Sequence, residues 1–67
     1  PAPNIAVGEA VLAARAKKDY TQKQLSEMTG IDQSDISKIE RGVANPSIST
    51  LNKIAVALGM HLYVSIA

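Results

Sequence analysis

Two short amphipathic segments separated by Gly30 constrain the fold of this chain more than any other feature. Thr21 and Gln24 have the spacing of a capping box, which predicts that the first segment is a helix beginning there. Gly30 predicts a tight turn after it, because glycine readily adopts the left-handed backbone that ends many helices. Asp32 is the expected N-cap of the second helix, and Gly42 its expected end. Two short helices joined in this way form a helix-turn-helix.

The second helix carries polar side chains suited to reading DNA. At about 100° per residue, four of its polar residues and Arg41 fall within an arc of roughly 140°, and Ile36 and Ile39 fall on the opposite side. The four candidate base-reading residues are Gln33, Ser34, Ser37 and Lys38. Glutamine can bind adenine through two hydrogen bonds, lysine can reach guanine, and serine suits several bases. The alternative is an ordinary solvated helix surface. The short helix and glycine turn before it favour the DNA reader.

Phosphate contacts are expected beside these base-reading residues. Gln22 lies in the first turn of its helix, where free N–H groups and the helix dipole attract anions. Asn45 lies in the loop after the second helix and could act similarly. Lys23, Lys38 and Arg41 could add cationic contacts. The candidate phosphate-binding set therefore combines polar and basic side chains.

Two further helices complete the predicted fold. Asn4 is the expected cap of a helix that runs to about Lys18, and Ser47 is the expected cap of one that runs to about Leu58. The apolar positions expected to face inward are Val7, Ala10, Val11, Ala14, Leu25, Met28, Ile31, Ile36, Ile39, Ile48, Leu51, Ile54, Ala55 and Leu58. The prediction is an all-α bundle. Residues 1–4 form a mobile leader and residues 5–59 the helix-turn-helix domain.

The last residues, 60–67, have a different period from the helices. Leu62, Val64 and Ile66 alternate with polar or amphipathic residues, which predicts a β-strand. A single strand cannot satisfy its backbone hydrogen-bonding groups alone. We therefore expect this strand to pair with its copy in a homodimer, or with a partner protein.

Composition excludes several other classes of protein. The 67 residues allow one small domain, and the absence of cysteine excludes disulfides and fits a reducing cytoplasm. No apolar run approaches the roughly 18 residues of a membrane span. His61 is the single histidine, and no nucleophile motif accompanies it, so we expect no enzyme, metal site or cofactor. The net charge of +1 does not by itself indicate a nucleic-acid partner.

With these motifs identified, the chain resembles the xenobiotic-response-element family of helix-turn-helix proteins, which includes the phage Cro-type repressors. The matching positions are Arg15, Thr21-Gln22, Leu25, Gly30-Ile31, Ser34, Ile36-Ser37, Ile39-Glu40, Gly42, Asn45-Pro46-Ser47, Leu51, Ile54-Ala55 and Ala57-Leu58-Gly59. The resemblance implies a repressor-like bundle of about four to five helices. It also implies a phosphate contact for Gln22, base contacts for the four residues named above, and an ion pair between Arg15 and Glu40.

The predicted strand is similar to the ending of DNA-binding antitoxins from toxin–antitoxin modules. Three functions therefore remain open. The first is a dimeric regulator, expected to be a repressor, that binds a palindromic site on double-stranded DNA. The second is an antitoxin that also binds a toxin. The third is a protein-interaction module without DNA binding, an alternative that the small net charge leaves open.

Overall fold

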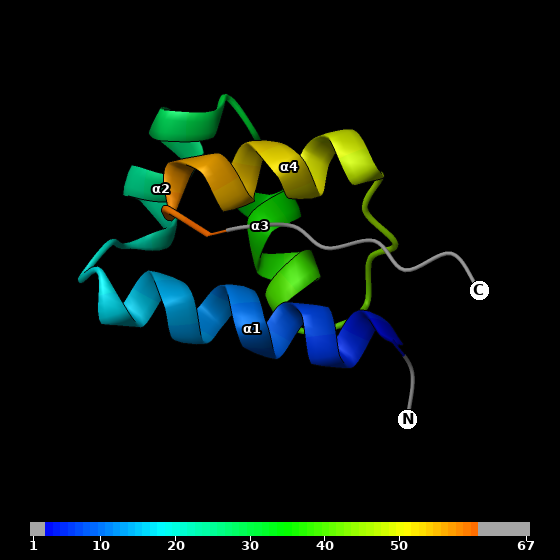
Figure 1. Ribbon diagram of the computed structural model, residues 1–67. Helices are drawn as coiled ribbons and strands as arrows, with labels where there is room; N and C mark the ends of the chain where they lie inside the picture. The colour runs from blue at the N-terminus through cyan, green and yellow to red at the C-terminus, as the bar shows by residue number, and fades with distance from the viewer. Residues whose placement is uncertain (1–2, 61–67) are drawn as a thin grey trace.

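The computed structural model describes residues 3–60, and this part of the chain consists of helices and connecting turns. Its four helices are α1 (Pro3–Lys17), α2 (Gln22–Thr29), α3 (Gln33–Glu40) and α4 (Ile48–Ala57). α1 and α4 lie along opposite sides of the bundle, with α3 between them (Figure 1). α3 packs against α1 and α2, and α2 also packs against α4. The predicted all-α fold is therefore confirmed for residues 3–60.

Local capping explains where α2 begins and ends. The Thr21 hydroxyl accepts a hydrogen bond from the Gln24 N–H at 3.0 Å, and the Gln24 side-chain oxygen accepts one from the Thr21 N–H at 2.8 Å. Asp19, just before this box, has a φ of 58°, a left-handed conformation that aspartate tolerates better than most residues. Gly30 ends α2 with a φ of 76°. The predicted capping box and glycine turn are both confirmed.

Several predicted helix ends differ in detail. α1 begins at Pro3, so Asn4 lies inside its first turn, and residues 3 and 4 belong to the helix rather than to a leader. Proline suits this position because the first helical N–H has no intrahelical acceptor. Asp32 precedes α3, but its side chain makes no capping hydrogen bond. Ser47 does cap α4, accepting a hydrogen bond from the Thr50 N–H at 3.1 Å.

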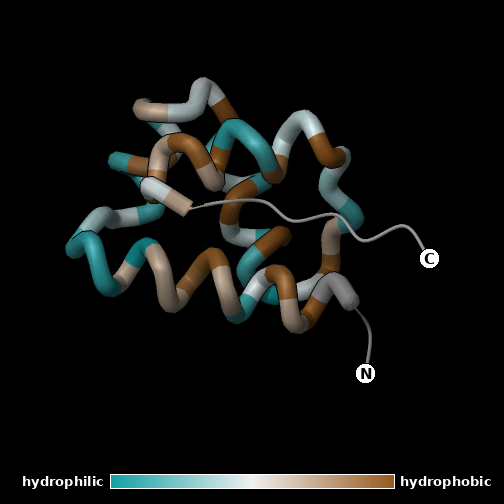
Figure 2. Tube along the Cα trace, viewed as in Figure 1, coloured by the Kyte–Doolittle hydropathy of each residue, from teal (hydrophilic) through white to brown (hydrophobic). Residues whose placement is uncertain are grey.

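The hydrophobic core lies where the four helices meet. Its buried residues are Val11, Leu25, Ile36, Ile39, Ile54 and Leu58, with Val7, Ala14 and Ile31 packed at its edge. Figure 2 shows strongly hydrophobic positions of α3 in the interior of the bundle. The isoleucines of α3 therefore anchor it in the core, and the opposite side of the helix lies on the surface of the bundle.

Three predicted inward positions are wrong. Met28 is 48% exposed and Ile48 is 61% exposed, and Ala10 is also exposed. Met28 lies near the end of a short helix, beside Tyr20 and Glu27 rather than over the core. Ile48 is the first residue of α4 and precedes the part of that helix that reaches the core. Helical period alone did not reveal where the neighbouring helices stop.

Gly8 is buried where α1 crosses α3, a role that helical periodicity did not predict. A Cβ atom at this position would lie 2.3 Å from the carbonyl oxygen of Ile39 and 2.7 Å from that of Glu40. Real atoms do not approach this closely, so a side chain would push the two helices apart. Gly8 therefore sets how closely α1 supports α3.

The predicted strand with Leu62, Val64 and Ile66 lies outside the described residues. Among the helices that the structure describes, none has both the length and the apolar composition needed to cross a membrane.

Candidate nucleic-acid interface

Two hydroxyl groups hold the turn between α2 and α3. The Thr29 hydroxyl donates to the Leu25 carbonyl at 2.8 Å and accepts from the Ile31 N–H at 3.2 Å. The Ser26 hydroxyl donates to the Ile31 carbonyl. Ile31 itself packs against the core. The direction in which α3 leaves α2 is therefore fixed by side-chain hydrogen bonds as well as by Gly30. This role of Ser26 and Thr29 was not predicted, although their short distance from a glycine turn was a usable signal.

The predicted base-reading residues lie on the outer side of α3. Gln33, Ser34 and Lys38 are exposed, and Ser37 is half-buried. Ile36 and Ile39, which fall opposite them, are 0% and 3% exposed. The outer side thus offers amide, hydroxyl and ammonium groups on a helix whose inner side is locked in the core.

Asp35 lies away from this outer side. It lines a shallow hollow together with Ile31 and Asn45, where the loop before α4 passes α3. This arrangement keeps one carboxylate away from the candidate base-reading residues. Asn45 lines the same hollow as Asp35, and a carboxylate in the surroundings disfavours a phosphate. Asn45 is therefore a weaker candidate for a phosphate contact than Gln22.

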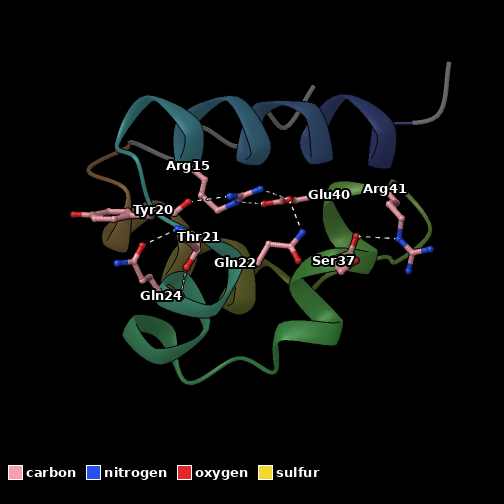
Figure 3. Close-up of polar contacts among 8 residues, drawn as sticks. All are labelled: Arg15, Tyr20, Thr21, Gln22, Gln24, Ser37, Glu40 and Arg41. Atoms are coloured by element: carbon pink, nitrogen blue, oxygen red, sulfur yellow. Dashed lines mark hydrogen bonds and ion pairs between the residues drawn. The ribbon is translucent and has the colours of Figure 1, made fainter.

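A carboxylate at the end of α3 joins three helices. Glu40 accepts hydrogen bonds from Arg15 Nε at 2.7 Å and from Arg15 Nη2 at 3.0 Å. It also accepts one from Gln22 Nε2 at 2.9 Å. Arg15 Nη1 donates to the Tyr20 carbonyl at 2.9 Å. In Figure 3, the side chains of Arg15 and Gln22 both point toward Glu40. The ion pair implied by the family resemblance is present, and it extends to Gln22.

The charges of this ion pair are stabilised by their surroundings. The Glu40 side chain is only 4% exposed, and that of Arg15 is 15% exposed. Burial alone would raise the pKa of Glu40, but hydrogen bonds from Arg15 and Gln22 and the Arg15 charge outweigh it and hold the pKa below its ordinary value. The hydrogen bond to Glu40 raises the pKa of Arg15. Both groups therefore stay charged near neutral pH.

The same network orients the Gln22 amide. One N–H of Gln22 Nε2 is used by Glu40, and the second N–H of this nitrogen is available to another acceptor. Gln22 is the first residue of α2, and the backbone N–H groups of Gln22 and Lys23 have no acceptor within the helix. Arg15 neutralises the carboxylate beneath them. This end of α2 thus gathers N–H donors suited to an anion.

Lys23 and Arg41, two of the basic candidates for phosphate contacts, are both exposed. Lys23 follows Gln22 in the first turn of α2. Arg41 follows α3, and its Nε donates to the Ser37 carbonyl at 3.3 Å, which holds the side chain along that helix (Figure 3). Its terminal nitrogens can still reach a phosphate beside α3. Among the described residues, no three His, Cys, Asp or Glu side chains gather as metal ligands would.

Comparison with known proteins places this geometry in a family. A helix-turn-helix family model matches residues 11–64, which include α2, the turn and α3. The chain belongs to this family. The resemblance to xenobiotic-response-element proteins is thereby confirmed. The antitoxin-like ending lies in residues that the structure does not describe.

Curated relatives of this family are regulators. The chain is 41% identical over 56 residues to the immunity repressor protein of Bacillus phage phi105, a match that covers 84% of this chain and 39% of the repressor. It is 39% identical over 57 residues to the HTH-type transcriptional regulator SlrR of Bacillus subtilis, covering 84% of this chain and 38% of SlrR. The chain thus spans about two-fifths of the length of these two relatives.

A solved structure has the same fold over nearly its full length. The restriction-modification controller protein C.AhdI from Aeromonas hydrophila superposes with a TM-score of 0.84 and 29% sequence identity. The superposition covers 87% of this chain and 88% of the controller protein. The helical arrangement described here is therefore that of a known controller protein.

Proposed function

We propose that this chain binds double-stranded DNA at specific sequences and regulates transcription, acting as a repressor. The observation that carries the proposal is the polar outer side of α3, which projects from a helix fixed on its other side by Ile36 and Ile39. Membership of the helix-turn-helix family supports it, as do relatives named as a repressor and a transcriptional regulator.

In this proposal, α3 enters the major groove and the start of α2 contacts the DNA backbone. Base contacts are assigned to Gln33, Ser34, Ser37 and Lys38. Glutamine and lysine side chains match the donor and acceptor patterns of adenine and guanine, and serine adapts to either. Phosphate contacts are assigned to Gln22, Lys23 and Arg41, with Asn45 as a weaker candidate. These contacts position the helix, whereas the base contacts select the sequence.

We further propose that the regulator acts as a homodimer on a palindromic site. A helix of eight residues reads few base pairs, and two copies related by a twofold axis double that number. We assign DNA binding to residues 5–59 and dimer pairing to the strand predicted in residues 60–67, which contains Leu62, Val64 and Ile66. The functions named for the relatives favour a regulator over an antitoxin, and no toxin partner is proposed.

Removal of two base-reading side chains tests the proposal. We expect Gln33→Ala combined with Lys38→Ala to lower affinity for a duplex enriched from a random-sequence library by about 1–3 kcal/mol for each base interaction that is removed. The fold should persist because both side chains are exposed. Fluorescence anisotropy titrations with that duplex and with one of unrelated sequence provide the measurement.

Lys53→Ala serves as a charge-matched control, because Lys53 is an exposed lysine on α4. We expect it to change affinity little and specificity not at all. If the folded double variant keeps the wild-type preference for the enriched duplex, α3 is not the reading helix.

A further inference from the structure

An apolar groove runs between α1 and α4. Val7 and Ala10 line it from α1, Leu51 and Ala55 line it from α4, and Met60, which follows α4, also lines it. The lining residues within the described part of the chain are all apolar, and the cavity measures about 130 Å³. An apolar cavity of roughly 150 Å³ can hold a group the size of benzene. The groove therefore has room for one or two aliphatic side chains.

The chain itself supplies such side chains directly after the groove. Met60 is a lining residue, and the sequence continues with Leu62, Val64 and Ile66 at alternate positions. In an extended segment, alternate side chains point to the same side. An extended conformation would thus give residues 62–66 one aliphatic side, which is the chemistry that the groove accepts.

Chain length favours an occupant from the same molecule. Val64 is the fourth residue after Met60, and an extended chain of this length reaches about 14 Å. Because Met60 already lines the groove, an extended segment that starts there is long enough to place Val64 in it. A segment tethered so closely has a far higher effective concentration at the groove than the same segment of a second molecule.

The family match supports the same occupant. The helix-turn-helix model extends to residue 64, four residues past Met60. The domain that this family shares therefore continues beyond the end of the described helices. A segment that belongs to the domain needs apolar surface to pack against, and the groove provides it.

We propose that the groove between α1 and α4 binds the aliphatic side of residues 62–66 of the same chain. In this proposal Val64 enters the groove, and Leu62 and Ile66 pack at its edges. This segment completes the core on a surface that the four helices leave open. The inference is independent of DNA binding, and the backbone edge of the segment stays free for pairing with a second copy.

Engineered cysteines test the proposal, because the chain has no native cysteine. Ala10 is exposed on the groove wall and tolerates substitution. We expect the full-length Ala10→Cys, Val64→Cys variant to form a disulfide within one chain under mild oxidation. The matched control is Ala10→Cys, Ser65→Cys, in which the second cysteine lies on the opposite side of the segment and should remain reduced. Non-reducing gels and mass spectrometry of digests distinguish bonds within one chain from bonds between chains.

Labelling of single cysteines provides a second readout. We expect a thiol reagent to modify the Val64→Cys variant roughly tenfold more slowly than the Ser65→Cys variant, because only the first thiol is covered. Equal labelling rates together with equal cross-linking at both positions would overturn the proposal. Covalent dimers from the Ala10→Cys, Val64→Cys variant would also overturn it, by showing that the segment occupies the groove of a second molecule.

Discussion

At the residue scale, Glu40 connects stability to the candidate phosphate site. Its carboxylate accepts hydrogen bonds from Arg15 of α1 and Gln22 of α2 while belonging to α3 itself. The Gln22 amide is thereby oriented in the absence of DNA, so in the proposed complex less conformational entropy would be lost on binding. Arg15 neutralises the carboxylate, which would otherwise repel a phosphate near Gln22.

The lowered pKa of Glu40 predicts that the free energy of unfolding decreases as the pH falls into the acid range. Because the folded state favours the ionised carboxylate, its stabilisation is fully present above the unfolded pKa of about 4.3 and is lost as pH falls through the folded value. We expect Glu40→Gln to cost about 1.5–3 kcal/mol in free energy of unfolding at neutral pH. The difference from wild type should shrink below about pH 4.

Urea unfolding at several pH values measures this dependence. Glu27→Gln is a matched control at an exposed position, and its unfolding curves should follow those of the wild type closely at neutral pH. A constant difference between wild type and Glu40→Gln over the whole acid range would contradict the role given to the Glu40 charge.

The pattern of residues predicted hydrogen bonds between some neighbouring residues but not those between distant helices. The capping box at Thr21 and Gln24 could be predicted because it depends on neighbours in sequence. The link from Gln22 to Glu40 could not, because it joins residues 18 positions apart and depends on how the helices pack. Family resemblance supplied the Arg15–Glu40 pair, and periodicity alone would have left two solvated charges.

At the element scale, the packing of α1 on α3 depends on Gly8. We expect Gly8→Ala to lower the free energy of unfolding by about 1–3 kcal/mol, because the added methyl group meets the Ile39 carbonyl. This destabilisation should appear although alanine favours helix over glycine by about 0.5–1 kcal/mol. For a domain of this size, each kcal/mol corresponds to roughly 4–8 °C in Tm.

Thermal unfolding followed by circular dichroism measures the effect. Ala13→Gly on the exposed side of the same helix calibrates the helix-propensity contribution separately. A Gly8→Ala protein as stable as the wild type would mean that the helices separate at little cost and that the close approach does not position α3.

Helix positions followed from sequence more readily than helix packing. Caps and glycines predicted α2 and the turn after it, since these signals act within a few residues. Met28 and Ile48 were placed inward because periodicity identifies a side of a helix but not where its neighbour ends. The need for a bare backbone at Gly8 likewise appears only when α1 and α3 are brought together.

At the scale of the whole molecule, a net charge of +1 provides little general attraction for DNA. In the proposed complex, binding would therefore depend on local hydrogen-bond donors at the start of α2 and on the outer side of α3. We expect affinity for DNA to fall as the salt concentration rises. The steepness of that fall should be set by the small number of phosphate contacts. Pairing of two copies would place two α3 helices on one side of the duplex and double the sequence read.

Sequence-specific DNA reading by a dimer of this chain can be measured by selection from a random duplex library, followed by sequencing and repeated at two salt concentrations. We expect enrichment of an inverted repeat whose half-site centres lie about 34 Å apart, bound more weakly at higher salt. A folded protein that enriches no sequence at either salt concentration would contradict both the assignment of α3 as the reading helix and the proposed regulatory function.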